Sequence, residues 1–171
     1  MKKGKHSAGA PTALEIAYNC EAMRTIISRA VDELRARDSL LLEYDVNERS
    51  IAHKLTNYLQ AEFLGWEVDC EHNRNHDNPK TLPLQRKKVS NDDLHACTVF
   101  PDIIVHHRNT DSNLLVIKIK KSTNTSSARW DKQKLSAFKK VLGYKFAVFL
   151  RLETGSNSSG RTCQIEFSKE P

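Results

Sequence analysis

The amino-acid sequence predicts a single domain of the α/β or α+β class. At 171 residues the chain is close to the usual length of one domain and can bury a core. Helical periodicity and strand-like alternation follow one another in the order α, α, β, β, β, α, β, β, without an internal repeat or a dividing linker. A hydrophobic fraction of 39% with 28% charged residues fits a soluble globular chain and is too mixed for intrinsic disorder. No apolar run approaches the roughly 20 residues of a membrane helix, so no membrane partner is expected.

Two helices are expected first. Residues 12–36 contain neither Pro nor Gly, and their apolar residues recur at intervals of three and four. We assign residues 12–38 to an N-terminal helical segment outside the core. A second helix is expected from Asp45, because Asp45 and Glu48 have the spacing of a capping box and the apolar pattern stops at Gly65.

Strand patterns begin after this second helix. Residues 66–71 alternate as a strand does, and the polar residues 72–95 predict a long loop of the kind that is functional or disordered. Two strands are expected at 99–106 and 114–120. The turn-forming residues 108–113 between them predict a β-hairpin.

One further helix and two strands complete the predicted domain. Asp131 is expected to be the N-cap or an early residue of this helix. The nearly all-apolar residues 146–150 predict a strand buried on both faces, and residues 162–167 predict the last strand. We therefore expect residues 45–152 to form the core of a domain that spans residues 12–171.

Charge and cysteine content limit the possible partners and the compartment. A net charge of +6 favours a polyanion such as nucleic acid without identifying one. Residues 1–11 are basic but have no apolar h-region behind them, so they predict a flexible tail and not a secretory signal. The four cysteines have no metal-site spacing, which favours reduced thiols in a cytoplasmic protein. His72 and His76 lie among loop formers, which disfavours a zinc site. A homodimer through the 12–36 helix is a further hypothesis.

The predicted hairpin brings an acid and two lysines together. Asp102 lies near the start of its strand, where a carboxylate among apolar residues is costly unless it is paired or exposed. On the next strand, alternate side chains point to opposite faces, so Lys118 and Lys120 share a face. The same face is expected to carry Leu114 and Val116, and the opposite face Leu115, Ile117 and Ile119.

Pro101-Asp102, fifteen intervening residues and then Lys118-Ile119-Lys120 resemble the signature of the PD-(D/E)XK nuclease superfamily. In that signature, Pro-Asp is followed on the next strand by an acid, any residue and Lys. The resemblance covers about residues 45–152 and includes an upstream helix that carries a Glu. It implies a restriction-endonuclease-like core, αβββαβ, with a central mixed sheet of four or five strands flanked by helices, plus an extra N-terminal helix.

The resemblance also implies an activity and a set of roles. The activity would be that of a metal-dependent DNA endonuclease, which hydrolyses phosphodiester bonds with Mg²⁺ or Mn²⁺. By similarity, Asp102 would be the central metal ligand, assisted by the backbone carbonyl of Ile119. Lys120 would orient the water or stabilise the developing charge. Glu48 would be the helix acid, on the side that packs against the sheet.

Lys118 stands where the family has Asp or Glu. A fixed ammonium beside Asp102 would pair with it and oppose a divalent cation, so we expect poor Mg²⁺ binding and little or no cleavage. Three explanations are open: an inactivating substitution in a nuclease whose active form carries Glu, natural decay to a binding module, or a missing oxygen supplied by Glu71. The alternative function is a non-catalytic nucleic-acid-binding or protein-interaction domain on the same fold.

Each site residue also has a purely structural interpretation. Asp102 could form a salt bridge with a lysine, Glu48 could cap its helix, and Glu71 could be an ordinary edge-strand charge. Nucleic acid would be contacted by a rim of cationic and polar side chains, which are equally compatible with simple solvation. The rim candidates are Arg86, Lys87, Lys88, Lys121, Gln133, Lys139 and Lys140.

Overall fold

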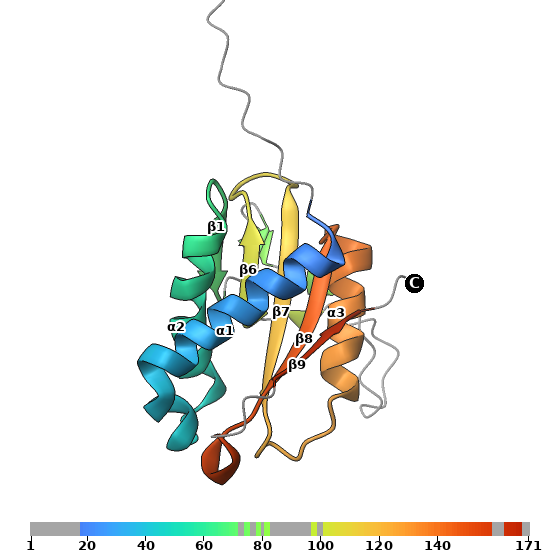
Figure 1. The fold of residues 1–171 in the computed structure, drawn as a ribbon. Helices are drawn as coiled ribbons and strands as arrows, with labels where there is room; N and C mark the ends of the chain where they lie inside the picture. Colours follow the sequence, from blue (N-terminus) through green and yellow to red (C-terminus); the bar gives the residue numbers. More distant parts are fainter. Residues whose placement is uncertain are drawn as a thin grey trace, which may run out of the picture.

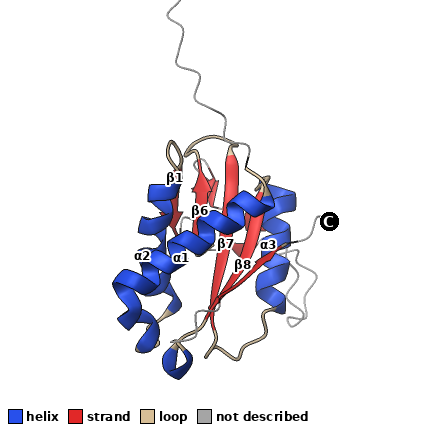
Figure 2. Ribbon diagram, in the orientation of Figure 1, coloured by secondary structure: helices blue, strands red, loops and turns tan. Residues whose placement is uncertain are grey.

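The computed structural model describes residues 18–71, 101–158 and 163–168, together with four two-residue strand segments between them. Its centre is a five-stranded mixed sheet in the order β1-β6-β7-β8-β9. Three helices flank this sheet, as Figures 1 and 2 show. The strands are β1 (Glu67–Cys70), β6 (Ile103–His106), β7 (Asn113–Lys121), β8 (Phe146–Leu152) and β9 (Cys163–Phe167). The predicted class, element order and mixed sheet are therefore confirmed at this level.

The direction of each strand follows from the connection that precedes it. β6 and β7 form the predicted antiparallel hairpin, and β1 and β9 are antiparallel edge strands. β7 and β8 are parallel, because the helix α3 (Arg129–Leu142) carries the chain back across the sheet between them. β8 is buried along almost its whole length, as its apolar sequence predicts.

The segment predicted as a long loop contains short strands. β2 (Arg74–Asn75) pairs with β3 (Asn78–Pro79), and β4 (Thr81–Leu82) pairs with β5 (Cys97–Thr98). Two-residue strands are too short to leave an alternating sequence pattern, so the sequence does not predict them.

The two N-terminal helices differ from their predicted bounds. α1 extends over Cys20–Glu43 and is capped by Asn19, whose side chain accepts from the N–H of Ala22 at 2.8 Å. It therefore continues past the predicted end at residue 36, with one non-helical residue at Asp38. The predicted start, residues 12–17, lies outside the described residues.

The helix α2 (Glu48–Glu62) shows that the predicted capping box is wrong. Its N-cap is Asn47, whose Oδ1 accepts from the N–H of Ser50 at 2.8 Å. Asp45 instead has a positive φ of 51° and lies in the turn between the helices. Asparagine and aspartate are about equally good N-caps, so the sequence allowed both starts, and the turn geometry selected the later one.

Two apolar layers hold the helices on the sheet. α1 crosses one face diagonally in Figure 1, and α1 and α2 bury residues such as Ile27 and Leu55 against Ile117. α3 covers the other face, where Leu135 and Phe138 lie in a second cluster with five buried sheet-side residues. These five are Ile104, Val116, Tyr144, Ala147 and Phe149.

Leu114 is on the opposite face from the predicted one. It belongs to the cluster under α1 and α2, together with its neighbour Leu115. The register shift is the cause: Val105 is opposite Leu115 and His106 is opposite Asn113, so Leu114 is an extra residue in a β-bulge. A bulge interrupts the strict alternation of side chains on which the prediction relied.

Within the described part of the chain, no helix has both the length and the apolar character needed to cross a membrane. Cys20, Cys70 and Cys163 are free thiols.

Candidate functional site

The candidate residues of the described part meet where β7 ends. Asp102 directly precedes β6, while Lys118 and Lys120 lie near the C-terminal end of β7. Glu48 is the first residue of α2, and Asp131 lies in the first turn of α3. Because Ile103 is opposite Ile117, the hairpin register places Asp102 directly beside Lys118. Residues distant in the sequence thus form one polar cluster.

Both carboxylate oxygens of Asp102 have a close donor. Oδ1 accepts from Nζ of Lys118 at 2.6 Å, and Oδ2 accepts from the backbone N–H of Ile119 at 2.6 Å. The side chains of Lys118 and Asp102 are only 21% and 15% exposed. A short, shielded pair of this kind is stronger than an exposed one. The expected pairing of the Lys118 ammonium with Asp102 is therefore present.

The environment of this pair shifts both pKa values. Burial raises the pKa of Asp102, against the effect of the Lys118 ammonium and the Ile119 N–H, and nearby Glu48 adds to the increase. Burial by itself lowers the pKa of Lys118, but the Asp102 carboxylate outweighs this effect and leaves that pKa above its usual value. Lys118 is therefore protonated at neutral pH and supplies the charge compensation that a buried carboxylate needs.

Lys120 is held by α3 and by the loop that precedes it. Its Nζ donates to Oγ of Ser126 at 2.7 Å and to Oδ2 of Asp131 at 3.3 Å, and the residue is 3% exposed. Asp131 is thus an early helix residue, as one of the two expectations had it. It is not the N-cap, which is Ala128 without a side-chain cap bond. The ammonium of Lys120 is engaged by these groups and not by Asp102.

Glu48 points to the end of β7. Its Oε1 accepts from the backbone N–H of Lys121 at 3.1 Å and from Nδ2 of Asn124 at 2.9 Å. The capping interpretation of Glu48 is therefore wrong.

Lys121, a candidate for the nucleic-acid rim, donates from Nζ to the backbone carbonyl of Asp45 at 2.9 Å and pairs with its carboxylate at 3.1 Å. Its side chain is only 15% exposed, which makes Lys121 a link to the turn between α1 and α2.

Glu71 contributes its backbone to the cluster but not its carboxylate. Its N–H donates to the carbonyl of Asp102 at 3.0 Å, whereas its Oε1 accepts from Nε of Arg49 at 2.7 Å. Among the described residues, no three His, Cys, Asp or Glu side chains gather as a metal would need. With Lys118 on Oδ1 of Asp102, the side chains present do not fit a divalent cation.

The remaining rim candidates lie apart from this cluster. Gln133 is exposed on α3, and Lys139 and Lys140 are in its last turn. Arg86, Lys87 and Lys88 lie outside the described residues, as do His72 and His76.

Sequence reasoning missed the partners of Lys120. From the sequence, Asp131 is expected only at the start of a helix, and no role is expected for Ser126 and Asn124. The available signal was the density of hydroxyl and amide side chains in residues 122–127, directly after a strand that ends in three lysines within four residues. Such a loop is able to satisfy buried ammonium groups, which need acceptors when they leave water.

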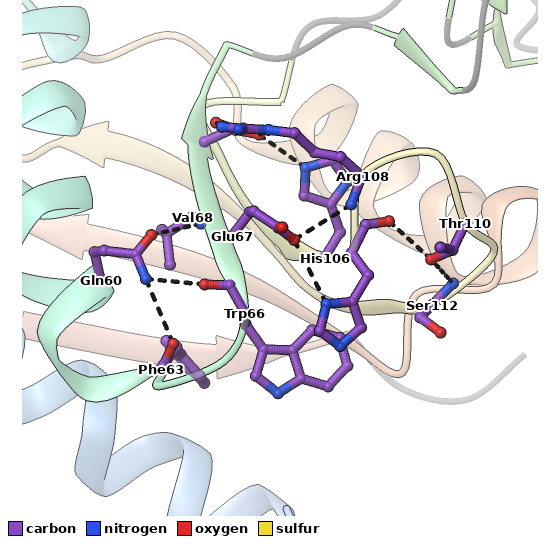
Figure 3. Close-up of polar contacts among 11 residues, drawn as sticks. Gln60, Phe63, Trp66, Glu67, Val68, His106, Arg108, Thr110 and Ser112 are labelled. Atoms are coloured by element: carbon purple, nitrogen blue, oxygen red, sulfur yellow. Dashed lines mark hydrogen bonds and ion pairs between the residues drawn. The ribbon is translucent and has the colours of Figure 1, made fainter. Parts of the chain in front are cut away.

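A second polar network lies at the other end of β6, at the edge formed with β1 (Figure 3). Nε2 of His106 contacts Oδ2 of Asp69 at 2.8 Å, and Arg108 donates to the same carboxylate from Nε at 2.9 Å and from a terminal nitrogen. Burial alone would raise the pKa of Asp69, but these donors outweigh it and lower the pKa to about 2. Trp66 stacks on His107 beside this network, with ring centroids 4.1 Å apart. The network links the edge strand β1 to β6 and to Arg108, and it is separate from the polar cluster around Asp102.

Comparison with known proteins gives no relative: no family model, no curated protein and no solved structure matches this chain.

Proposed function

We propose that this chain is a restriction-endonuclease-like domain of the PD-(D/E)XK type that engages DNA, and that Lys118 makes it catalytically impaired. The observation that carries the proposal is the 2.6 Å contact between Lys118 Nζ and Asp102 Oδ1, within a cluster that also holds Glu48 and Lys120. The resemblance of the sequence motif supports the choice of family, and the contact supports the proposed impairment. Both a divalent cation and the ammonium would use the same carboxylate, so the two exclude each other.

The charge balance of the cluster supports this proposal. Three lysines are bonded to or lie near four carboxylates, which leaves one net negative charge. With Glu at position 118, the same cluster would carry three net negative charges, and one divalent cation would bring it back to one. Lys118 thus supplies in this chain the charge that a metal would supply in an active form. The residues counted are Lys118, Lys120, Lys121, Asp45, Glu48, Asp102 and Asp131.

Lys118→Glu tests the proposal, with Lys118→Met as the matched control. Lys118→Met removes the ammonium without adding a ligand, so only Lys118→Glu is expected to gain binding of Mg²⁺ or Mn²⁺ in calorimetry. The same variant is expected to cleave plasmid, single-stranded or branched DNA in the presence of the metal, while the unmodified chain does not. Circular dichroism confirms that each variant is folded. A folded Lys118→Glu protein that binds neither metal and cleaves none of these substrates refutes the proposal.

One observation favours the second candidate, a non-catalytic binding domain on the same fold. Lys118 and the Ile119 N–H each bind one oxygen of the Asp102 carboxylate, so in the unmodified chain this carboxylate is compensated without a metal ion and without a catalytic role. Salt-dependent binding of DNA by the unmodified chain and by Lys118→Glu alike, without cleavage by either, would support this second function.

A further inference from the structure

The helix α3 has an unusual excess of positive charge. Its 14 residues carry five cationic side chains and a single carboxylate, that of Asp131. The carboxylate is only 16% exposed and pairs with Lys120 beneath the helix. Positive charge therefore dominates the outer surface of α3.

Helical geometry gathers most of these cations in one stripe. At about 3.6 residues per turn, six residues fall within an arc of roughly 120° that excludes the buried Leu135 and Phe138 and borders Leu135 on one side. The stripe extends over about 16 Å, or roughly five base-pair rises of about 3.4 Å. We call this set the α3 stripe: Arg129, Lys132, Gln133, Ser136, Lys139 and Lys140.

Ion pairing distinguishes the α3 stripe from the cations of α1 and α2. On those helices Arg29 pairs with Glu62, Arg37 with Glu33, and Lys54 with Asp38. Within the described part of the chain, by contrast, no carboxylate pairs with the three stripe cations at positions 129, 139 and 140.

The fourth stripe cation, Lys132, contacts Glu166 at 2.8 Å, with both side chains about half exposed. A pair this exposed contributes little to stability, and a phosphate can replace its carboxylate. Among the described residues, no buried or shielded ion pair thus occupies the four cations of the stripe.

The first two turns of the stripe border a shallow, open hollow whose described lining contains no acidic residue. Arg129, Lys132 and Gln133 line it together with the small residues Ser127, Ala128 and Ser136. Guanidinium, ammonium, amide and hydroxyl groups are the donors that bind phosphate oxygens. The described lining also contains no aromatic ring, so it offers no platform for base stacking.

From this surface we infer that the α3 stripe docks the phosphate backbone of a nucleic-acid duplex, independently of base sequence. The inference rests on the proposed function for the choice of nucleic acid as the polyanion. It adds the surface: the backbone runs along α3 and reaches the Asp102 cluster at the helix N-terminus, where Asp131 and Lys120 meet.

The test compares two triple variants that remove equal charge from different faces. One is Arg129→Gln, Lys139→Gln, Lys140→Gln, and the matched control is Arg29→Gln, Arg37→Gln, Lys54→Gln. Fluorescence anisotropy with a short labelled DNA duplex is measured between about 50 and 200 mM salt. Loss of three phosphate contacts is expected to reduce the slope of log K against log salt by about 2.7 and to weaken binding at low salt at least tenfold. The control triple is expected to keep both values.

Three results would overturn the inference. They are an unchanged slope in the stripe triple, an equal loss in the control triple, or no duplex binding by the unmodified chain up to about 100 µM at low salt. Binding to anionic lipid vesicles but not to duplex would likewise assign the stripe to a different partner. Metal binding by Lys118→Glu is measured separately. An unchanged slope in the stripe triple with metal binding intact thus refutes only the docking surface, whereas no duplex binding by the unmodified chain also refutes the DNA binding of the proposed function. A changed slope without metal binding by Lys118→Glu refutes only the nuclease site.

Discussion

Replacing Lys118 by Met would leave the Asp102 carboxylate buried without its cation. Removing one partner of a buried pair costs about 3–5 kcal/mol. Because Asp102 is 15% exposed and keeps the N–H of Ile119, we expect the lower end of that range, about 3 kcal/mol at pH 8. For a chain of this length, that corresponds to a fall in melting temperature of about 6–12 °C.

The loss of unfolding free energy in Lys118→Met is expected to depend on pH. Burial already raises the pKa of Asp102, and the variant loses the ammonium that opposes this increase. An acid whose pKa is higher in the folded state contributes stability at low pH and loses it as the pH rises through that pKa. The cost of Lys118→Met is therefore expected to shrink as the pH falls from 8 to about 5.

Urea unfolding of both proteins at pH 8 and pH 5 measures this difference. Lys132→Met is the control, since it breaks an exposed pair with Glu166 and is expected to cost about 1 kcal/mol or less at either pH. A Lys118→Met protein as stable as the unmodified chain at pH 8, or one whose deficit grows toward pH 5, would refute the burial argument.

Three further substitutions test other parts of the fold. Asp69→Asn is expected to reduce the free energy of unfolding by about 2 kcal/mol at pH 7, because folding lowers the pKa of Asp69 to about 2. This difference is lost as the pH falls from about 4 toward 2, and melting temperatures of both proteins measured across that range follow it. Gly143→Ala is expected to cost about 1 kcal/mol from backbone conformation alone, since φ is 69° and no atom lies within 4 Å of an added Cβ; a melting temperature equal to that of the unmodified chain contradicts this. Phe138→Ala is expected to cost about 3–5 kcal/mol in urea unfolding, because the ring is 2% exposed and meets Tyr144 edge-on; a cost under about 1 kcal/mol would mean that α3 is not anchored by this ring.

The sequence was sufficient for the order of elements because each element carries its own periodic or apolar signal. Residues 146–150 are nearly all apolar, and they lie in β8, which both layers of helices cover. The hairpin around residues 108–113 follows from two strand patterns separated by turn formers. Its register then brings Asp102 beside Lys118, so this part of the candidate site was predictable from alternation and the motif together.

Three features of the structure could not be predicted from local sequence patterns: the N-cap of α2, the bulge at Leu114 and the partner of Lys120. The predicted N-cap of α2 is Asp45, and the observed N-cap is Asn47, two residues later. Both residue types cap helices about equally well, so the turn that follows α1 determines which one is used. The bulge at Leu114 has no sequence signature of its own. The pairing of Lys120 with Asp131 arises only when α3 packs against β7, which is a tertiary contact between separate elements.

The three lysines at the end of β7 join this strand to three other parts of the chain. Lys118 binds Asp102 before β6, Lys120 binds Asp131 on α3, and Lys121 binds Asp45 in the turn between α1 and α2. Each pair thus connects β7 to a different segment of the chain. An acid at position 118 would remove one of these links and add a negative charge beside Asp102, so the fold would then depend on a bound cation for the same compensation. Under the proposed function, Lys118 would therefore replace the charge of a bound cation while the contacts of Lys120 and Lys121 are retained.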